Sequence, residues 1–180
     1  MKFCRFVLSC MALCSLSFRA SAQNNPPTAS EQNACGPAGA AFTVEFDNRA
    51  PAPSDSEPGK ALVFVVDAYQ GALEPSAMPT VRLALDGSWM GATRGKSYIF
   101  FAAEPGRHRL CATGQGDTKD LENQRALQEF NAEAGKTYFF RLQTTNRAKG
   151  EAQMELQPMD AKDAKYLIAD ADHAIAHRKK

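Results

Sequence analysis

Strand-like segments of alternating polarity, separated by turn residues, restrict this chain to a β-sheet fold. FTVEF (42–46) and TVRLAL (80–85) place an apolar residue at every second position. Alternation of this kind is typical of a strand with one buried face. Similar short runs recur along the chain, so we predict about seven to nine strands in an all-β, antiparallel β-sandwich of immunoglobulin-like type. The other runs lie at 61–69, 88–92, 97–103, 107–113 and 152–159, and residues 126–144 contain two more on either side of a turn at Gly135 and Lys136.

Two local signals refine this prediction. Asp86 and Gly87 lie between two strand-like runs, and both residue types tolerate the positive φ angles of a two-residue hairpin turn. ALVFVVDAY (61–69) is apolar at nearly every position, which indicates a central strand covered on both faces. Trp89 stands beside the turn, so we expect it to cap the sandwich. The predicted core is Val44, Val63, Val65, Leu83, Leu85, Ile99, Leu110, Phe139 and Leu156.

The N-terminus has the features of a secretory signal peptide. Lys2 and Arg5 precede an apolar run over 6–18, and ASA (20–22) matches a small-x-small cleavage site. The run is shorter than the roughly 20 residues of a transmembrane helix. We therefore predict cleavage after Ala22 and a secreted or periplasmic mature chain.

Cleavage at this position changes the cysteine count. Cys4, Cys10 and Cys14 leave with the signal, so Cys35 and Cys111 remain. An even pair in an exported chain is the pattern expected of a disulfide, here one that ties the strand ending at Cys111 to the N-terminal segment. Two buried free thiols are the alternative. There are two alternatives to cleavage after Ala22: an uncleaved anchor, or cleavage and lipidation at Cys10, where VLSC resembles a lipobox.

The charge pattern argues against a nucleic-acid partner. The signal carries three basic residues and no acidic one, so the mature chain has 18 basic against 20 acidic side chains. The basic residues are scattered along the chain, whereas nucleic-acid-binding proteins concentrate them on one face. We expect no nucleic-acid partner, and no membrane span once the signal is removed.

Composition divides the chain into four parts. Residues 1–22 are the signal peptide, and residues 23–34 (QNNPPTASEQNA) are polar and aperiodic, so we predict a disordered lead. Residues 35–160 have the length of one β-sandwich domain. Residues 161–180 are predicted to be a short C-terminal helix, capped by Asp160, and a frayed tail.

Four segments carry a family resemblance. They are ACGP (34–37), PGKALVF (58–64), the stretch 81–112 and AEAGKTYFFRL (132–142). In this order they resemble a bacterial family of exported proteins described as domain of unknown function 2846. The resemblance implies a small secreted or envelope-associated β-sandwich with Cys35 and Cys111 paired, and it implies no activity. The middle stretch also resembles PEGA-type β modules.

A metal site is the sharpest chemical hypothesis for the tail. Asp170, His173 and His177 stand at i, i+3 and i+7, which places them on one face of a helix, and such residues bind zinc. Three ligands on one terminal helix lack the hydrogen-bonding neighbours that orient metal ligands. We therefore predict a solvated polar face, with no metal and no other cofactor.

The sequence offers no catalytic motif. It contains no GxSxG, and no nearby serine or cysteine forms a base–nucleophile pair with His108. His108 is in phase with Leu110, so we expect it to point inward and to be hydrogen-bonded. We predict that the protein is not an enzyme; a metal-dependent hydrolase is the alternative.

Binding is the remaining class of function. Trp89, Arg94, Tyr98 and Tyr138 are predicted to form an aromatic and basic patch around 86–97. Such a surface stacks on sugars or anchors a protein. We expect a secreted or cell-envelope, non-catalytic binding or structural module whose partner is an envelope protein or a glycan. A glycan- or peptidoglycan-binding domain is the alternative.

Overall fold

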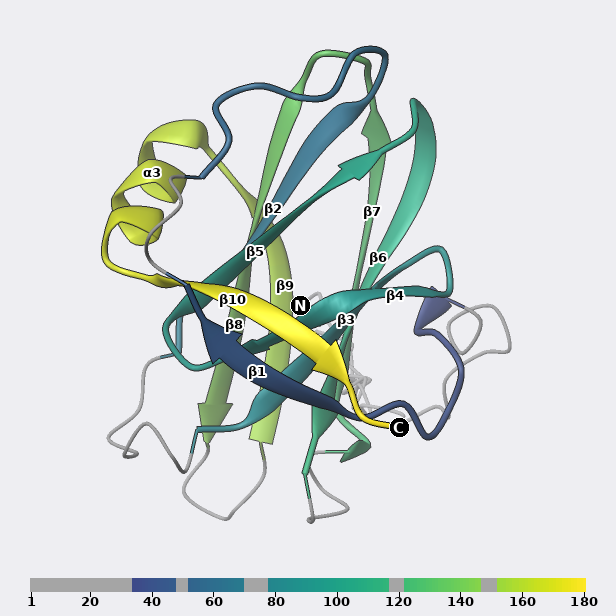
Figure 1. Ribbon diagram of the computed structural model, residues 1–180, viewed down its shortest axis with the longest axis vertical. Helices are drawn as coiled ribbons and strands as arrows, with labels where there is room; N and C mark the ends of the chain where they lie inside the picture. The colour runs from purple at the N-terminus through teal and green to yellow at the C-terminus, as the bar shows by residue number, and fades with distance from the viewer. Residues whose placement is uncertain (1–33, 48–51, 70–77, 117–121, 147–151) are drawn as a thin grey trace, which may run out of the picture.

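The computed structural model describes residues 34–47, 52–69, 78–116, 122–146 and 152–180 of the chain (Figure 1). Within these residues, two β-sheets pack face to face, and the short helix α3 (Ala161–Ala169) lies against one of them. The all-β prediction with a short C-terminal helix is therefore confirmed. The predicted signal peptide lies outside the described residues, as does the predicted disordered lead except for Ala34.

One sheet has six strands and the other has four. The six-stranded sheet has the spatial order β1 (Phe42–Phe46), β10 (Asp172–Arg178), β5 (Ser97–Ala103), β2 (Ala61–Asp67), β8 (Thr137–Asn146), β9 (Ala152–Met159). The four-stranded sheet has the order β4 (Ser88–Arg94), β3 (Thr80–Leu85), β6 (Gly106–Gln115), β7 (Arg125–Ala132).

The sheets are mostly antiparallel, as predicted, with two exceptions. Among the described strand pairs, β2 with β8 and β10 with β5 are parallel, and the other six pairs are antiparallel. Parallel neighbours need a long connection. Short turns after β4, β5 and β7 carry the chain from one sheet to the other.

Apolar side chains from both sheets form the core between them. The central strand β2 is buried along its whole length, as predicted. Val63 and Val65 point into this core, while Leu62, Phe64 and Val66 face the opposite side, beneath α3. At the margins of the sandwich β4 lies against β10 and β7 lies against β9, so the edges of the two sheets approach each other.

One predicted core residue faces the other way. Phe140, only 1% exposed, fills the core between the sheets, and Phe139 packs under α3 instead. The other eight predicted core residues lie in the core cluster. Alternation cannot distinguish the two phenylalanines, because both faces of β8 are covered and TYFF is apolar at three successive positions.

The hairpin at Asp86 and Gly87 is confirmed, since their φ angles are 50° and 82° and β3 pairs with β4. The register of this pair shifts once: Leu83 pairs with Gly91 and Ala84 with Trp89. The extra residue between the two partners forms a β-bulge, which changes the face to which a side chain points. Trp89 therefore shares the outer face of the sheet with Ala84.

The C-terminal residues form a strand, so the prediction of a frayed tail is wrong. Asp160 caps α3 as expected, because its Oδ1 accepts hydrogen bonds of 2.9 Å from the backbone N–H groups of Lys162 and Asp163. After α3 the chain enters β10, between β1 and β5, and extends the sandwich beyond the predicted boundary at residue 160. DHAIAHR contains a single large apolar residue, Ile175, between alanines and polar residues, which weakens its strand signal.

Candidate functional site

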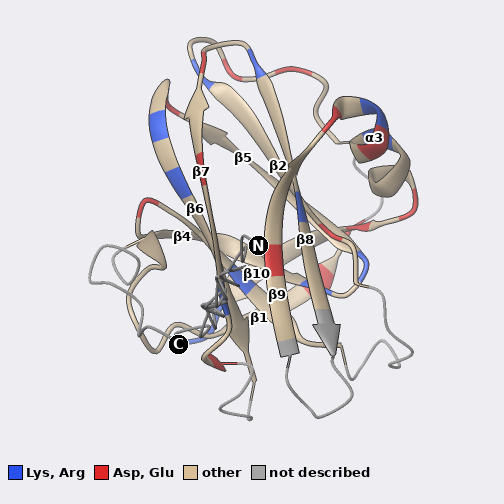
Figure 2. Cartoon of the chain, turned by 180° about the vertical axis from the view of Figure 1, so that it is seen from behind, with Lys and Arg blue, Asp and Glu red and all other residues tan. Residues whose placement is uncertain are grey.

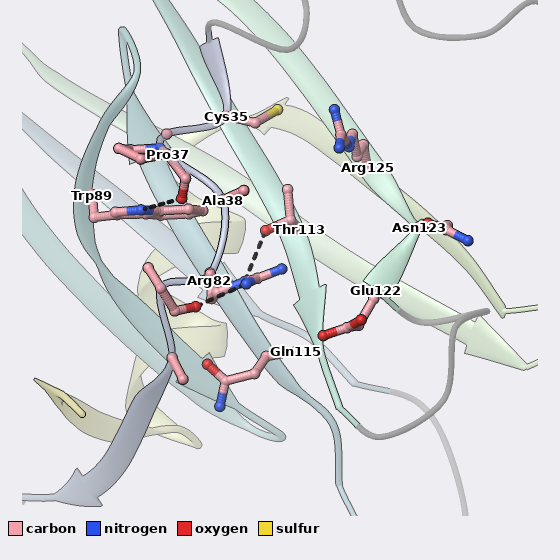
Figure 3. A pocket seen from close by; sticks show the side chains of 14 residues that line it. Cys35, Pro37, Ala38, Arg82, Trp89, Thr113, Gln115, Glu122, Asn123 and Arg125 are labelled. Atoms are coloured by element: carbon pink, nitrogen blue, oxygen red, sulfur yellow. Dashed lines mark hydrogen bonds between the residues drawn. The ribbon is translucent and has the colours of Figure 1, made fainter. Parts of the chain in front are cut away.

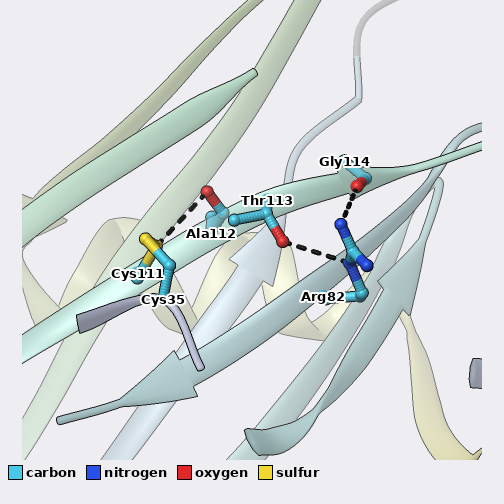
Figure 4. Close-up of a disulfide and its surroundings, with 6 residues drawn as sticks. All are labelled: Cys35, Arg82, Cys111, Ala112, Thr113 and Gly114. Atoms are coloured by element: carbon cyan, nitrogen blue, oxygen red, sulfur yellow. Dashed lines mark hydrogen bonds between the residues drawn. A yellow bond between two sulfur atoms is a disulfide. The ribbon is translucent and has the colours of Figure 1, made fainter. Parts of the chain in front are cut away.

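Residues 34–41 cover the outer face of the four-stranded sheet and are joined to it by a disulfide. Cys35 is bonded to Cys111 of β6, with their Cα atoms 5.1 Å apart (Figure 4), so this predicted bridge is confirmed. Both cysteines are buried, and they form a small apolar cluster with Ala84 on this face. The disulfide thereby fixes one wall of a cleft that opens beside it.

Trp89 supports this wall. Its indole Nε1 donates a hydrogen bond of 3.2 Å to the carbonyl oxygen of Pro37. A Cβ atom on Gly36 would lie 2.6 Å from Cε2 of the indole, and φ of Gly36 is +72°, so glycine is the residue that fits here. The guanidinium carbon of Arg82 lies 5.5 Å from the ring centroid. Figure 3 shows the indole between Pro37 and Arg82, so it is already enclosed.

Arg82 is a half-buried cation held by uncharged oxygen atoms. Its Nε donates to Oγ1 of Thr113 (3.1 Å), and its two terminal nitrogens donate to the carbonyls of Ala40 (2.8 Å) and Gly114 (2.7 Å). Within the described part of the chain, no carboxylate forms an ion pair with it. Burial lowers the pKa of Arg82, an effect opposed by Glu122 and reinforced by Arg125. An acidic ligand would supply the charge that its present partners lack.

The cleft has a volume of about 480 Å³, within the range of ligand pockets. Its wall is the segment 35–41 with Trp89, and its polar lining is Arg82, Thr113, Gln115, Glu122, Asn123 and Arg125 (Figure 3). The amide of Gln115 is occupied, because it both accepts from and donates to the backbone of Phe42. The side chain of Arg125 has no hydrogen bond or ion pair with another described residue, which leaves its guanidinium available to a ligand.

Sequence reasoning found Trp89 but missed the charged residues of the cleft. Arg82 lies in TVRLAL at a position that alternation assigns to the outer face of the strand. This position was the signal that could have identified Arg82 as a surface residue of the cleft. Glu122 and Arg125 follow a Gly-rich loop and form no motif. Only the pairing of β3, β6 and β7 brings them to the same face as Arg82.

The predicted patch of Trp89, Arg94, Tyr98 and Tyr138 is not assembled. The Arg94 guanidinium lies over the ring of Phe46, 5.3 Å from its centroid. Tyr98 is buried on the outer face of the six-stranded sheet. Tyr138 packs beside the core, and its hydroxyl accepts a hydrogen bond from the backbone N–H of Glu133. The four residues do not converge, because Tyr98 faces the outer side of the six-stranded sheet and Tyr138 faces the core, while Trp89 and Arg94 belong to the four-stranded sheet.

The predicted tail residues do not share a helix face either. Asp170 caps the end of α3 and pairs with Lys96 at 2.6 Å, while His173 and His177 belong to β10. His173 stacks on the rings of Tyr98 and Phe100, and His177 lies 3.8 Å from Glu45. In the described residues no group of three potential ligands gathers.

Two further titratable groups have structural partners. The ring nitrogens of His108 bond to the Asp86 carboxylate and to the Glu104 carbonyl, each at 2.6 Å. His108 is therefore hydrogen-bonded, as expected. Burial lowers its pKa, but these two partners outweigh that effect and raise it above the ordinary value. Burial raises the pKa of Asp67 to about 8 although Thr93 donates to it, so Asp67 is largely neutral at pH 7.

A family model described as a protein of unknown function (DUF2846) matches residues 57–154. The chain belongs to this family. Within this DUF2846 protein, the match contains Arg82, Trp89 and Cys111 but neither Cys35 nor α3. The disulfide thus joins the matched region to a residue outside it. No curated protein and no solved structure matches the chain.

Proposed function

We propose that this protein is exported, with cleavage after Ala22, and serves as a non-catalytic binding module of the cell envelope. Its binding site is the cleft beside the disulfide, and its ligand is an acidic group carried by an envelope protein or a glycan. The half-buried Arg82, with only uncharged partners at the base of the cleft, carries this proposal.

Arg125 and Arg82 give the cleft two cations against the single carboxylate of Glu122. Hydrogen bonds between arginine and a carboxylate are stronger than those between neutral groups, and arginine can bind both oxygens at once. An acidic group between the two guanidinium groups would relieve their mutual repulsion. The cleft therefore favours a negatively charged ligand over a neutral one.

The non-catalytic character is supported by how the reactive residues are used. The Cys111 sulfur is part of a disulfide and fully buried, so it is no nucleophile. Both ring nitrogens of His108 are bonded within the protein.

No helix in the described residues has the length and apolarity needed to cross a bilayer. Figure 2 shows basic and acidic positions interspersed along the described strands, which fits a local site better than an extended basic surface.

A sugar-stacking site centred on Trp89 is the weaker candidate. Stacking needs an open aromatic face, but the indole lies between the Gly36–Pro37 backbone and the Arg82 guanidinium. Any glycan in this cleft would instead be held through its acidic groups.

Retention of the full exported chain on envelope material tests the proposal. Cell-wall sacculi and detergent-extracted envelope proteins serve as separate baits, so that the two sources of an acidic group are distinguished. We expect Arg125→Met to weaken retention at least about fivefold, since a charged hydrogen bond contributes about 1 kcal/mol or more. Arg125→Met should leave the fold intact, because its side chain has no described partner.

Arg107→Met is the matched control, because Arg107 is exposed and pairs with Glu129 on the same sheet but does not line the cleft. Equal retention of wild type and Arg125→Met on both baits would reject the cleft as the site. Retention should also fall with rising salt.

A further inference from the structure

The helix α3 covers the outer face of the six-stranded sheet only in part, and a cavity of about 550 Å³ remains between them. Its sheet side is formed by Phe64 and Phe139, whose rings stack with centroids 5.2 Å apart. Its helix side is formed by Ala161, Lys165, Ile168 and Ala169, and its rim by Ala52, Pro53, Ser54 and Thr137. The cavity is thus lined mainly by carbon.

A second cavity of about 360 Å³ adjoins the first around Phe139. The two share Thr137, Phe139 and Ala161 as lining residues. The second is also chiefly apolar, with Phe130, Tyr138, Phe140, Pro158 and Met159 in its lining. We call the two together the apolar channel. Its first part lies beneath α3 and its second part lies at the margin where β7 lies against β9, with Phe139 lining both.

The space beneath α3 opens to solvent, since Ala161, Lys165 and Ala169 of the helix are exposed. Its volume of hundreds of cubic ångströms is in the range of ligand sites. Only Ala164 of α3 is fully buried, and Tyr166 is 78% exposed. The helix therefore roofs the aromatic face of the sheet without filling it.

The charges of the channel are asymmetric. Lys165 is the one charged residue lining the first cavity, and it forms no ion pair with a described residue. The second cavity has Glu129 at its border, but that carboxylate is already paired with Arg107 and Arg109. An occupant would thus find an unpaired cation at the α3 end and an apolar path leading away from it.

We propose that the apolar channel binds a single-chain anionic amphiphile, a fatty acid, with its carboxylate at Lys165 and its unbranched acyl chain around Phe139. Aliphatic chains are flexible enough to follow a bend, and the thioether of Met159 can adapt to them. The site lies on the opposite side of the sandwich from the Arg82 cleft, since α3 and residues 34–41 cover the outer faces of different sheets (Figure 1). This inference is independent of the proposed function.

Displacement of a fluorescent fatty acid from the full exported chain by saturated fatty acids of increasing length tests the assignment. Each added methylene should tighten binding, by up to about fourfold, until the channel is full, after which affinity should level off. Ala161→Trp should abolish binding, because Ala161 lines both cavities and a larger side chain would fill them. Lys162→Trp is the matched control, since the neighbouring Lys162 lines neither cavity and should leave affinity unchanged.

The carboxylate is tested separately with Lys165→Met. This variant should weaken binding of the fatty acid about fivefold, the effect of an ion pair worth about 1 kcal/mol. Binding of the fatty alcohol of equal length should not change. Phospholipid vesicles in place of fatty acid should not displace the probe. This charge test does not depend on the folding of Ala161→Trp.

Three results would overturn the proposal. One is a folded wild-type protein that binds no fatty acid of any length. Another is equal affinity in Ala161→Trp and wild type, with both shown to be folded by circular dichroism. The third is a dimer whose interface buries the channel, which would assign it to a second copy of the chain.

Discussion

The two outer faces of the sandwich are covered in different ways. Residues 34–41 lie on the four-stranded sheet, fixed by the Cys35–Cys111 disulfide and by hydrogen bonds from Arg82 and Trp89. On the six-stranded sheet lies α3, which is held among the described residues mainly by apolar contacts around Leu167 and Ile168, with an exposed ion pair at its end. We call residues 34–41 the first cover and α3 the second cover. The first cover is held by a covalent bond and directional hydrogen bonds, whereas the second cover is held mainly by the burial of apolar surface.

This difference separates two kinds of site. A covalently fixed wall beside two arginines can select a ligand by charge and direction. A roof held by hydrophobic contact, which is non-directional, tolerates space beneath it and occupants of varied length. The structure thus has a polar cleft where its cover is covalently fixed and an apolar channel where it is not.

Removing the disulfide should have the largest effect. The bridge joins positions 76 apart, and the Cys35→Ala/Cys111→Ala double variant should lose about 4 kcal/mol of unfolding free energy by the chain-entropy estimate. Urea unfolding measures this. Reduction of the wild type should give a similar loss, and a double variant as stable as wild type would show that the first cover does not depend on the bridge.

Gly36→Ala should break the contact between the first cover and Trp89. The new Cβ would meet the indole at 2.6 Å, and the positive φ adds strain, so we expect a loss of about 2 to 4 kcal/mol. Trp89 is the single tryptophan, so its fluorescence should shift as well. Gly39→Ala is the control, since its φ is +79° but nothing lies within 4 Å of its Cβ. Equal effects of the two variants would show that backbone strain alone is responsible.

Asp160→Ala should loosen the second cover. Loss of the helix cap costs about 1 kcal/mol, which should expose the amides of α3 to faster hydrogen exchange while the β2 amides stay protected. Asp163→Ala, which removes a carboxylate from the first turn but not the cap, should have a smaller effect. Equal protection of α3 in wild type and Asp160→Ala would show that apolar contact alone holds the helix.

The smallest expected effect is the contribution of His108 to the pH dependence of stability, which adds to that of the buried Asp67 in β2. Because folding raises the pKa of His108, its contribution is fully present below the ordinary histidine pKa of about 6.5 and is lost as pH rises through the folded value. Asp86→Asn keeps a residue suited to the turn but removes the charge, so it should flatten this slope. Asp160→Ala should keep the slope. Unfolding free energies across this pH range provide the measurement, and an unchanged slope in Asp86→Asn would contradict the assignment.

Local patterns were sufficient for most of the strands. The predicted runs 42–46, 80–85, 97–103 and 152–159 coincide with β1, β3, β5 and β9, because period-two alternation records which face of a strand is buried. The Asp86–Gly87 turn followed from backbone sterics, and the cap at Asp160 from hydrogen bonding within a few residues. The pairing of Cys35 with Cys111 followed from the number of cysteines that remain after the predicted signal peptide is removed. All of these depend on interactions that short segments or composition encode.

Only the tertiary structure decided which strands are neighbours. Alternation of polarity shows which face of a strand is buried but not which strand lies beside it. The parallel pairs β2–β8 and β5–β10 therefore left no sequence signal. The strand at 172–178 was missed because its stability comes from its position between β1 and β5. Arg82 and Arg125 meet only through strand pairing, and the space around Phe139 depends on how α3 rests on the sheet. Such features arise from contacts between residues far apart in the chain, which no local pattern records.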